Sequence, residues 1–221
     1  MHLLTFNNIR IYAVPKCGYC TITYYYLKYK YPKLFKKNLS KNPSPKNIFK
    51  TVQQAWKIAK KRGEHKLTEN IKDFSLHDYY IYIRNPFDRI YSSYLYRKKK
   101  YNLKEFNTFI NNRLESLMYK DKHIFPMWYL FKKYNVIKHS NILKFENFSE
   151  SFKQLLINNN INETKINNYH KNKKKKNYKK IYTQKSINKI KKLYAWDIKN
   201  FNYNFDNTNN KELNLQVKDL I

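Results

Sequence analysis

The sequence predicts an α/β fold, in which helices flank a mainly parallel sheet. Short strand candidates alternate with amphipathic helix candidates along 221 residues, and this alternation is typical of parallel strands joined by helical crossovers. The run Tyr-Tyr-Ile-Tyr-Ile at 79–83 is nearly continuous in apolar and aromatic residues, as expected for the buried middle of a parallel sheet. The length fits one domain, which we place at residues 1–205, followed by a polar C-terminal tail at 206–221.

Each element is predicted from the spacing of its apolar residues and from the residues that interrupt it. Strand candidates are short β-prone runs, and helix candidates carry apolar residues at helical spacing. Pro15 ends the first strand, Pro32 ends the first helix, and Gly63 is a plausible C-cap. The expected elements in order are strand 9–14, helix 21–31, loop 36–46, helix 47–61, strand 79–83, helices 87–99 and 103–117, strand 141–145, helix 148–156, low-complexity loop 158–180 and helix 183–197.

The chain is strongly basic, with 46 Lys and Arg residues against 15 Asp and Glu residues and a formal net charge of +31. Cations gathered on one face could bind nucleic acid. However, the 40 Lys residues far outnumber the 6 Arg residues, Asn is frequent at 30, and Ala and Gly are scarce at 4 and 2. This profile indicates a coding bias that raises Lys everywhere, so we do not expect nucleic acid as a partner. The same bias makes each Gly and each Arg informative about a local requirement.

Nothing in the sequence predicts export or a membrane anchor. Residues 1–9 are too short and polar for a signal peptide, and no apolar run reaches the length of a membrane span. Cys17 and Cys20 are too few for a disulfide framework or a four-cysteine zinc site, and no other ligand cluster indicates a metal. We therefore expect a cytoplasmic protein that needs no metal, whose oligomeric state the sequence leaves open.

Residues 15–21, Pro-Lys-Cys-Gly-Tyr-Cys-Thr, which we call the first loop, predict an anion site. They join a strand to a helix, and backbone N–H groups at a helix N-terminus attract phosphate. Lys16 adds a positive charge and Thr21 a hydroxyl donor, while Gly18 lets the backbone turn sharply or approach a phosphate closely. The loop lacks the Gly-x4-Gly-Lys-Ser/Thr spacing of a Walker A motif.

Cys17 and Cys20 also form a Cys-x-x-Cys pair between a strand and a helix, which resembles the redox site of glutaredoxins. The chain is much longer than a glutaredoxin. It also lacks the Val-Pro dipeptide and the Gly-Gly pair that bind glutathione in that family. We therefore keep a redox role only as an alternative.

Residues 84–92, Arg-Asn-Pro-Phe-Asp-Arg-Ile-Tyr-Ser, which we call the second loop, predict another anion site. Arg84 directly follows a predicted strand, at the end of the sheet where open α/β folds bind their ligands. Ser92 lies two helical turns further on, so its hydroxyl and the Arg84 guanidinium can face one phosphate. Arg89 is expected to pair with Asp88, or with another acid, on the helix surface.

Together these segments resemble the PAPS-dependent sulfotransferases, which use 3′-phosphoadenosine 5′-phosphosulfate as the sulfuryl donor. The closest branch contains Golgi carbohydrate sulfotransferases and their microbial and viral relatives. Five landmarks occur in the family order over roughly residues 9–205, and this resemblance implies a three-layer, P-loop-like fold. The landmarks are Pro-Lys-x-Gly-x-x-Thr at 15–21, Arg-Asn-Pro-Phe-Asp-Arg-x-x-Ser-x-Tyr at 84–94, Asp-Lys-His-Ile-Phe-Pro at 121–126, Ile-Leu-Lys-Phe-Glu-Asn-Phe at 142–148 and the Tyr-rich segment at 178–205.

The resemblance implies sulfuryl transfer from PAPS to a hydroxyl, of a carbohydrate in this branch, with adenosine 3′,5′-bisphosphate (PAP) as product and no metal. Arg84 and Ser92 would bind the 3′-phosphate of the donor. His170 and Lys173, in a Lys-rich run, resemble a family loop that closes over the nucleotide. The residues implied to bind the 5′-phosphosulfate are those of the first loop, Lys16, Cys17, Gly18, Tyr19, Cys20 and Thr21, with Lys16 also neutralising the leaving phosphate as a catalytic group.

A general base must accept the proton of the acceptor hydroxyl. Glu64 and His65 lie where many relatives place the base, and we favour them slightly. His123 belongs to one of the landmarks, and His77 is a further candidate. The residues leave this choice open.

The first loop also departs from the family pattern. Tyr19 and Cys20 stand where relatives carry Ser or Thr, so two hydroxyl donors are missing, and Met127 replaces a Gln of the landmark at 121–126. Donor binding would then rest on backbone amides, Lys16 and Thr21. A non-catalytic relative that binds nucleotide or polyanion is therefore the main alternative, whereas the missing Walker motif disfavours a nucleotide kinase.

Overall fold

The structure is a computed structural model that describes residues 1–39, 44–62, 78–97, 105–161, 178–206 and 213–220. Its sheet has four strands in the order β1-β2-β3-β4. The strands β2 (Ile9–Ala13), β3 (Asp78–Ile83) and β4 (Asn141–Lys144) are parallel, and β1 (His2–Phe6) is antiparallel to β2. The predicted α/β class with a mainly parallel sheet is confirmed.

The edge strand β1 was not predicted. It forms a hairpin with β2 around Asn7 and Asn8, and Asn7 adopts a positive φ of 43°. Tight hairpin turns favour Asn because this residue tolerates positive φ. The Asn-Asn pair between two apolar runs was therefore the signal for the additional strand.

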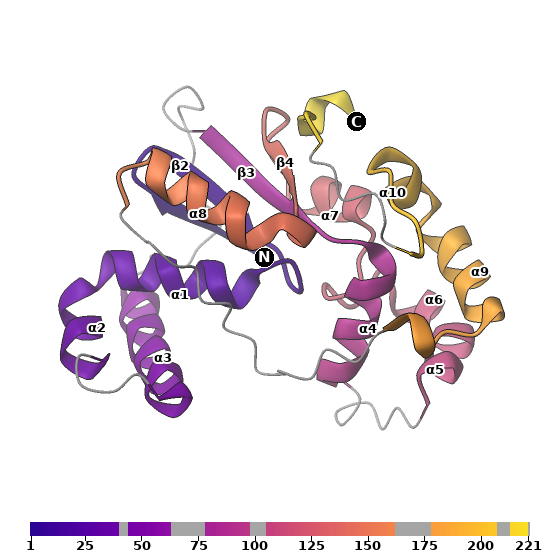
Figure 1. Cartoon of the computed structure of the whole chain (residues 1–221), viewed down its shortest axis with the longest axis horizontal. Coiled ribbons are helices and arrows are strands. Elements are labelled where there is room, and N and C mark those ends of the chain that lie inside the picture. Colours follow the sequence, from indigo (N-terminus) through magenta and orange to yellow (C-terminus); the bar gives the residue numbers. More distant parts are fainter. Residues whose placement is uncertain (40–43, 63–77, 98–104, 162–177, 207–212, 221) are drawn as a thin grey trace.

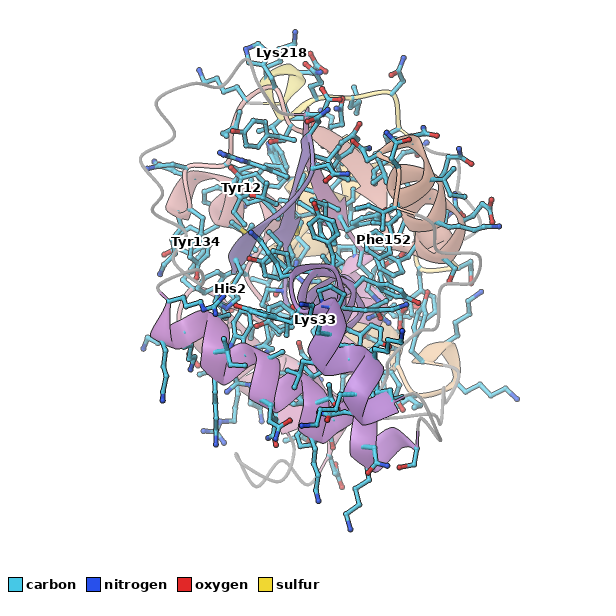
Figure 2. The ribbon with its side chains drawn as sticks, turned by 90° about the vertical axis from the view of Figure 1, so that its left-hand side faces the viewer. His2, Tyr12, Lys33, Tyr134, Phe152 and Lys218 are labelled. Carbon is cyan, nitrogen blue, oxygen red and sulfur yellow. The ribbon has the colours of Figure 1, made fainter. Side chains whose placement is uncertain are left out.

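Helices cover both faces of the sheet, and this arrangement forms the three layers that were expected (Figure 1). On one face, Phe6 packs edge-on against Tyr26 of α1 (Tyr19–Lys30), with their ring centroids 5.8 Å apart. On the same face Tyr82 contacts Phe148 of α8 (Phe148–Asn158), with centroids 4.8 Å apart. On the other face the Tyr12 hydroxyl accepts a hydrogen bond from the backbone N–H of Ile137, just after α7 (Met127–Lys133). Figure 2 labels Tyr12 and Phe152, which lie on opposite sides of the sheet.

Proline starts helices in the N-terminal third of the chain. Pro32 follows the end of α1, as predicted, but it also opens α2 (Pro32–Leu39), which takes up the start of the loop that we expected at 36–46. Pro45 occupies the first turn of α3 (Pro45–Lys61), whose N-cap Ser44 accepts a hydrogen bond from the backbone N–H of Asn47 at 3.2 Å. Proline suits the first helical turn because the N–H group that it lacks has no helical partner there.

The remaining helices form a second apolar cluster around Phe87, Ile90 and Tyr194. The predicted helix 103–117 is interrupted at Arg113, and the predicted helix 183–197 is interrupted at Tyr194. Helix α7 was not predicted. The helices not yet introduced are α4 (Pro86–Arg97), α5 (Phe106–Asn112), α6 (Leu114–Leu117), α9 (Gln184–Leu193) and α10 (Ala195–Asn200), with short 3₁₀ turns at Phe145–Asn147, Tyr178–Lys180 and Val217–Asp219.

The end of the chain is packed against the sheet. The backbone N–H of Val217 donates to the carbonyl of Ser140 at 3.0 Å, and the N–H of Ile142 donates to the carbonyl of Leu215 at 3.1 Å. The Val217 side chain is fully buried. The polar tail that we predicted at 206–221 therefore packs against the fold over residues 213–220, while the domain boundary at 205 stays a prediction. No helix in the described ranges is both long and apolar enough to cross a bilayer.

We expect Val217→Ala to lower the free energy of unfolding by about 2 kcal/mol, because the lost methyl groups leave a gap in a fully buried site. Denaturant unfolding measures this change. Lys218→Ala, one residue on and exposed, is the matched control and should be close to neutral. If both variants are equally stable, the C-terminal segment does not pack as described.

Candidate functional site

The carboxyl ends of β2, β3 and β4 lie at one edge of the sheet because these strands are parallel. The first loop follows β2, the second loop follows β3, and residues 145–147, which we call the third loop, follow β4. Arg84 Nη1 donates to the carbonyl of Lys16 at 2.8 Å, which joins the first two loops. The backbone N–H of Asn85 donates to Glu146 Oε1 at 2.9 Å, which joins the second and third loops. The structure therefore brings the two predicted anion loops together.

The backbone of the first loop turns sharply into α1. Lys16 and Gly18 adopt positive φ angles of 69° and 83°, and Gly18 is the N-cap of α1. A Cβ atom at Gly18 would lie 2.5 Å from the ring of Phe148. Glycine is therefore required both by the turn and by the close approach of α8. Because Gly18 has no side chain, it provides no side-chain cap, and the N-terminal end of α1 opens onto the loop.

The Lys16 ammonium group lies over the ring of Tyr96 on α4, 4.1 Å from the ring centroid. Burial lowers the pKa of Lys16 to about 8, and the positive charges of Arg84 and Arg97 act in the same direction. The ammonium group is therefore still mostly protonated at pH 7, but it is poorly solvated. A phosphate or sulfate group would gain more from this cation than from a lysine on the open surface.

Arg84 is largely engaged within the protein. Its Nε and Nη2 atoms donate to Asp88 Oδ2 at 3.0 and 2.7 Å, in addition to the bond from Nη1 to Lys16. The guanidinium carbon also lies 4.6 Å from the centroid of the Phe145 ring. Since a guanidinium carries five N–H groups, two remain for a ligand. Arg84 thus holds the loops together, in addition to any part it takes in binding an anion.

The surface ion pair expected between Arg89 and Asp88 is wrong, because Asp88 pairs with Arg84. Arg89 is instead buried, with 2% of its surface exposed. It donates to the carbonyl of Phe125 at 2.6 Å and contacts the sulfur of Met127 at 3.3 Å. Arg89 therefore anchors the landmark segment at 121–126 to α4, and Met127 takes part in that contact.

The remaining predicted groups of the described chain lie close to these loops. Ser92 is half-buried on α4, and Thr21 is buried in the first turns of α1. His123 belongs to the segment that Arg89 anchors. Its Nδ1 atom lies 2.8 Å from Asp121 Oδ1 and 2.6 Å from Arg97 Nη2. Five predicted site residues lie outside the described residues, and so does the expected C-cap Gly63. The five are Glu64, His65, His77, His170 and Lys173.

The two cysteines do not resemble a reactive pair. Cys17 is fully buried, and burial raises the pKa of its thiol to about 11. Cys20 is exposed. A redox-active Cys-x-x-Cys site needs an accessible thiol with a lowered pKa, so the geometry disfavours the glutaredoxin-like alternative. Tyr19, the other unusual residue of the loop, is half-buried at the start of α1.

Several structurally important residues were missed by sequence reasoning. Asn85 is fully buried, its side chain accepts a hydrogen bond from the N–H of Phe87, and its amide donates to the carbonyl of Asn204. Glu146 also accepts a hydrogen bond from the hydroxyl of Tyr203, and burial raises the pKa of Glu146. Each of these residues stands within or beside a landmark segment, which was the signal that could have identified it.

A model of the sulfotransferase family matches residues 5–204. No curated protein and no solved structure matches the chain. The matched range begins in β1 and ends after α10, so it includes all three loops of the candidate site. By this match, which covers most of its length, the chain belongs to the sulfotransferase family.

Proposed function

We propose that this sulfotransferase takes the sulfuryl group from PAPS and transfers it to a hydroxyl of a carbohydrate. Family membership gives the sulfuryl transfer, whereas the donor and the acceptor are our proposal. The observation that carries it is the junction of the first and second loops, where Arg84 holds the backbone of Lys16 at the carboxyl edge of the sheet. Lys16 stands two residues before the N-cap of α1, and its poorly solvated ammonium group lies over Tyr96. A cation and a free helix N-terminus on one loop suit a phosphosulfate.

In this proposal the first loop binds the 5′-phosphosulfate. The acceptor oxygen attacks the sulfur in line, and the bond from sulfur to the bridging oxygen breaks. Negative charge then grows on the leaving phosphate, where Lys16 and the N-terminus of α1 stabilise it. Tyr19 and Cys20 lack the Ser or Thr hydroxyl that relatives carry at these positions. The backbone of the loop and Thr21 therefore contribute more of the binding to the phosphosulfate.

The 3′-phosphate is assigned to the second loop. Arg84 retains two N–H groups after its contacts with Asp88 and Lys16, and the Ser92 hydroxyl lies two turns along α4. This phosphate distinguishes PAPS from ATP. The proposed chemistry requires no metal.

The carbohydrate acceptor is inferred from the resemblance to the carbohydrate branch and from the surface beside Lys16. Tyr96, against which Lys16 lies, is 56% exposed, so the exposed part of this aromatic side chain can contact a sugar ring. Glu64, His65 and His77 stay candidates for the general base. Among the described residues, His123 is the candidate that lies near Lys16.

We expect affinity for PAP to fall as the pH rises above about 8, because the Lys16 ammonium loses its proton in that range. The phosphates stay fully ionised there, since their second pKa is about 6. Titration calorimetry from pH 7 to 9.5 measures this decline. Lys16→Arg is the matched control, because a guanidinium keeps its charge throughout. An equal decline in this variant would assign the pH dependence to another group.

We expect Ser92→Ala to weaken PAP binding by about tenfold or more, the cost of one hydrogen bond to a charged group. Arg84→Ala should weaken it further, because the first loop also loses its tie to β3. Arg113→Ala removes the same charge from an exposed site and serves as the control in the same binding assay. If all three variants bind as the wild type does, the 3′-phosphate lies elsewhere.

Labelled PAPS incubated with a panel of glycans and tyrosine peptides tests the reaction itself. We expect label on a glycan, and a rate about 10²-fold lower in Lys16→Ala because charge on the leaving phosphate is no longer neutralised. Label on peptides alone would overturn the carbohydrate acceptor. Salt-sensitive binding of polyanions without transfer would identify the non-catalytic relative.

A further inference from the structure

Tyr96 is the most exposed tyrosine of the described ranges, with 56% of its surface accessible. Its hydroxyl makes no hydrogen bond with any described residue, whereas the hydroxyl of Tyr29, an exposed tyrosine of α1, donates to Asn7. Tyr96 lies in the last turns of α4, four residues after Ser92. An unbonded hydroxyl is therefore open to solvent at the edge of the candidate site.

The Tyr96 ring is held beside the first loop. The Lys16 ammonium lies 4.1 Å from the ring centroid, and the His123 imidazole stacks on the ring with centroids 5.5 Å apart and an interplanar angle of 24°. Burial, the charge of Cys20 and the charge of Tyr96 together raise the pKa of Tyr19 to about 12, with burial the largest cause. The Tyr96 hydroxyl is thus close enough to the first loop to act on it electrostatically.

The proposed reaction places a sulfuryl group next to this hydroxyl. Because Lys16 stabilises the leaving phosphate in that reaction, its ammonium group lies near the bridging oxygen, and the sulfur is one bond away. The Tyr96 hydroxyl is attached to the ring that Lys16 contacts. An oxygen held beside a bound reactant reacts far faster than one in free solution. Tyr96 is therefore placed as an acceptor even when no glycan is bound.

We propose that Tyr96 is a self-sulfation site, at which the enzyme transfers a sulfuryl group to its own phenol when PAPS is bound and no glycan is present. This inference rests on the proposed function, because it uses the same donor and the same cation. The phenol oxygen forms a bond to sulfur, while the bond from sulfur to the bridging oxygen breaks. The electron pair of that bond leaves with the 5′-phosphate of PAP, and the phenol proton passes to water, to which Tyr96 is exposed.

The product acts on the donor site. A sulfate ester on Tyr96 carries a negative charge beside the Lys16 ammonium. Because burial leaves this ammonium poorly solvated, it gains from the ester as it would gain from the phosphate of the donor. The ester and PAPS therefore compete for one cation. We expect the sulfated protein to bind PAP about tenfold more weakly, the loss of one hydrogen bond to a charged group.

Full-length protein incubated with labelled PAPS and no glycan tests this proposal. We expect label in the peptide 90–97, and fragmentation of that peptide should place it on Tyr96. Tyr91 and Tyr94 lie in the same peptide but are buried, so they serve as internal controls. Label on either of them instead of Tyr96 would contradict the proposed geometry. Titration calorimetry of the labelled protein measures the loss of PAP affinity, and an unchanged affinity would contradict the competition for Lys16.

Two variants separate the hydroxyl of Tyr96 from its ring. Tyr96→Phe keeps the ring on which Lys16 lies and removes the hydroxyl, so this variant should stay unlabelled. Tyr119→Phe is the matched control, because Tyr119 is 45% exposed but packs against Trp128 and Tyr129. This control should take up label as the wild type does.

The kinetics show whether the transfer occurs within one chain. We expect a first-order rate constant for labelling that does not change with protein concentration. A rate constant that rises in proportion to concentration would mean that one molecule sulfates another, and would overturn the inference. Absence of label on Tyr96 in protein that binds PAP and sulfates a glycan would also overturn it, and would leave the proposed function intact. If the wild type binds no PAP, the proposed function itself fails.

Discussion

The candidate site depends on the side chain of Arg84. One guanidinium bonds to the backbone of the first loop, pairs with Asp88 at the start of α4 and stacks on Phe145 of the third loop. Three segments that leave the sheet from adjacent parallel strands are thereby held in one arrangement. Lysine could not replace it, because a compact ammonium group lacks the planar guanidinium, which bonds to Asp88 through two nitrogen atoms and to Lys16 through the third while lying over the Phe145 ring. An anion bound there would meet a loop whose shape is already determined, so little ordering would be required on binding.

A second set of contacts holds the neighbouring loops through buried hydrogen bonds and not through an ion pair. Asn85 caps α4, bonds to the chain at Asn204 and donates its backbone N–H to Glu146, which also accepts from Tyr203. These groups are buried, so any unpaired member would be costly. The segments at 84–94, 142–148 and 178–205 thus occur together because their polar groups satisfy one another.

The charge of the chain and the charge of the site have different origins. A net charge of +31 spread over lysines says little about specificity, because exposed ammonium groups are well solvated and screened. Lys16 differs because burial of its side chain, which lies over Tyr96, lowers its pKa to about 8. The composition could not reveal this difference. It follows from the environment of one side chain among the many Lys residues of the sequence.

By itself, the sequence determined the α/β class, most of the strands and helices, the positions of the two candidate anion loops and the family, because periodicity, turn residues and landmark spacing are local properties. It did not reveal β1, whose Asn-Asn turn we did not weigh, nor the helix that begins at Pro32. Tertiary structure alone decided which partner each charged group takes. Asp88 is adjacent to Arg89 in the sequence but pairs with Arg84, because Arg89 points into the core towards Phe125. Likewise, only folding brought Tyr96 and Arg97 of α4 to His123, and Tyr96 to Lys16, since contacts between distant segments depend on how the layers pack.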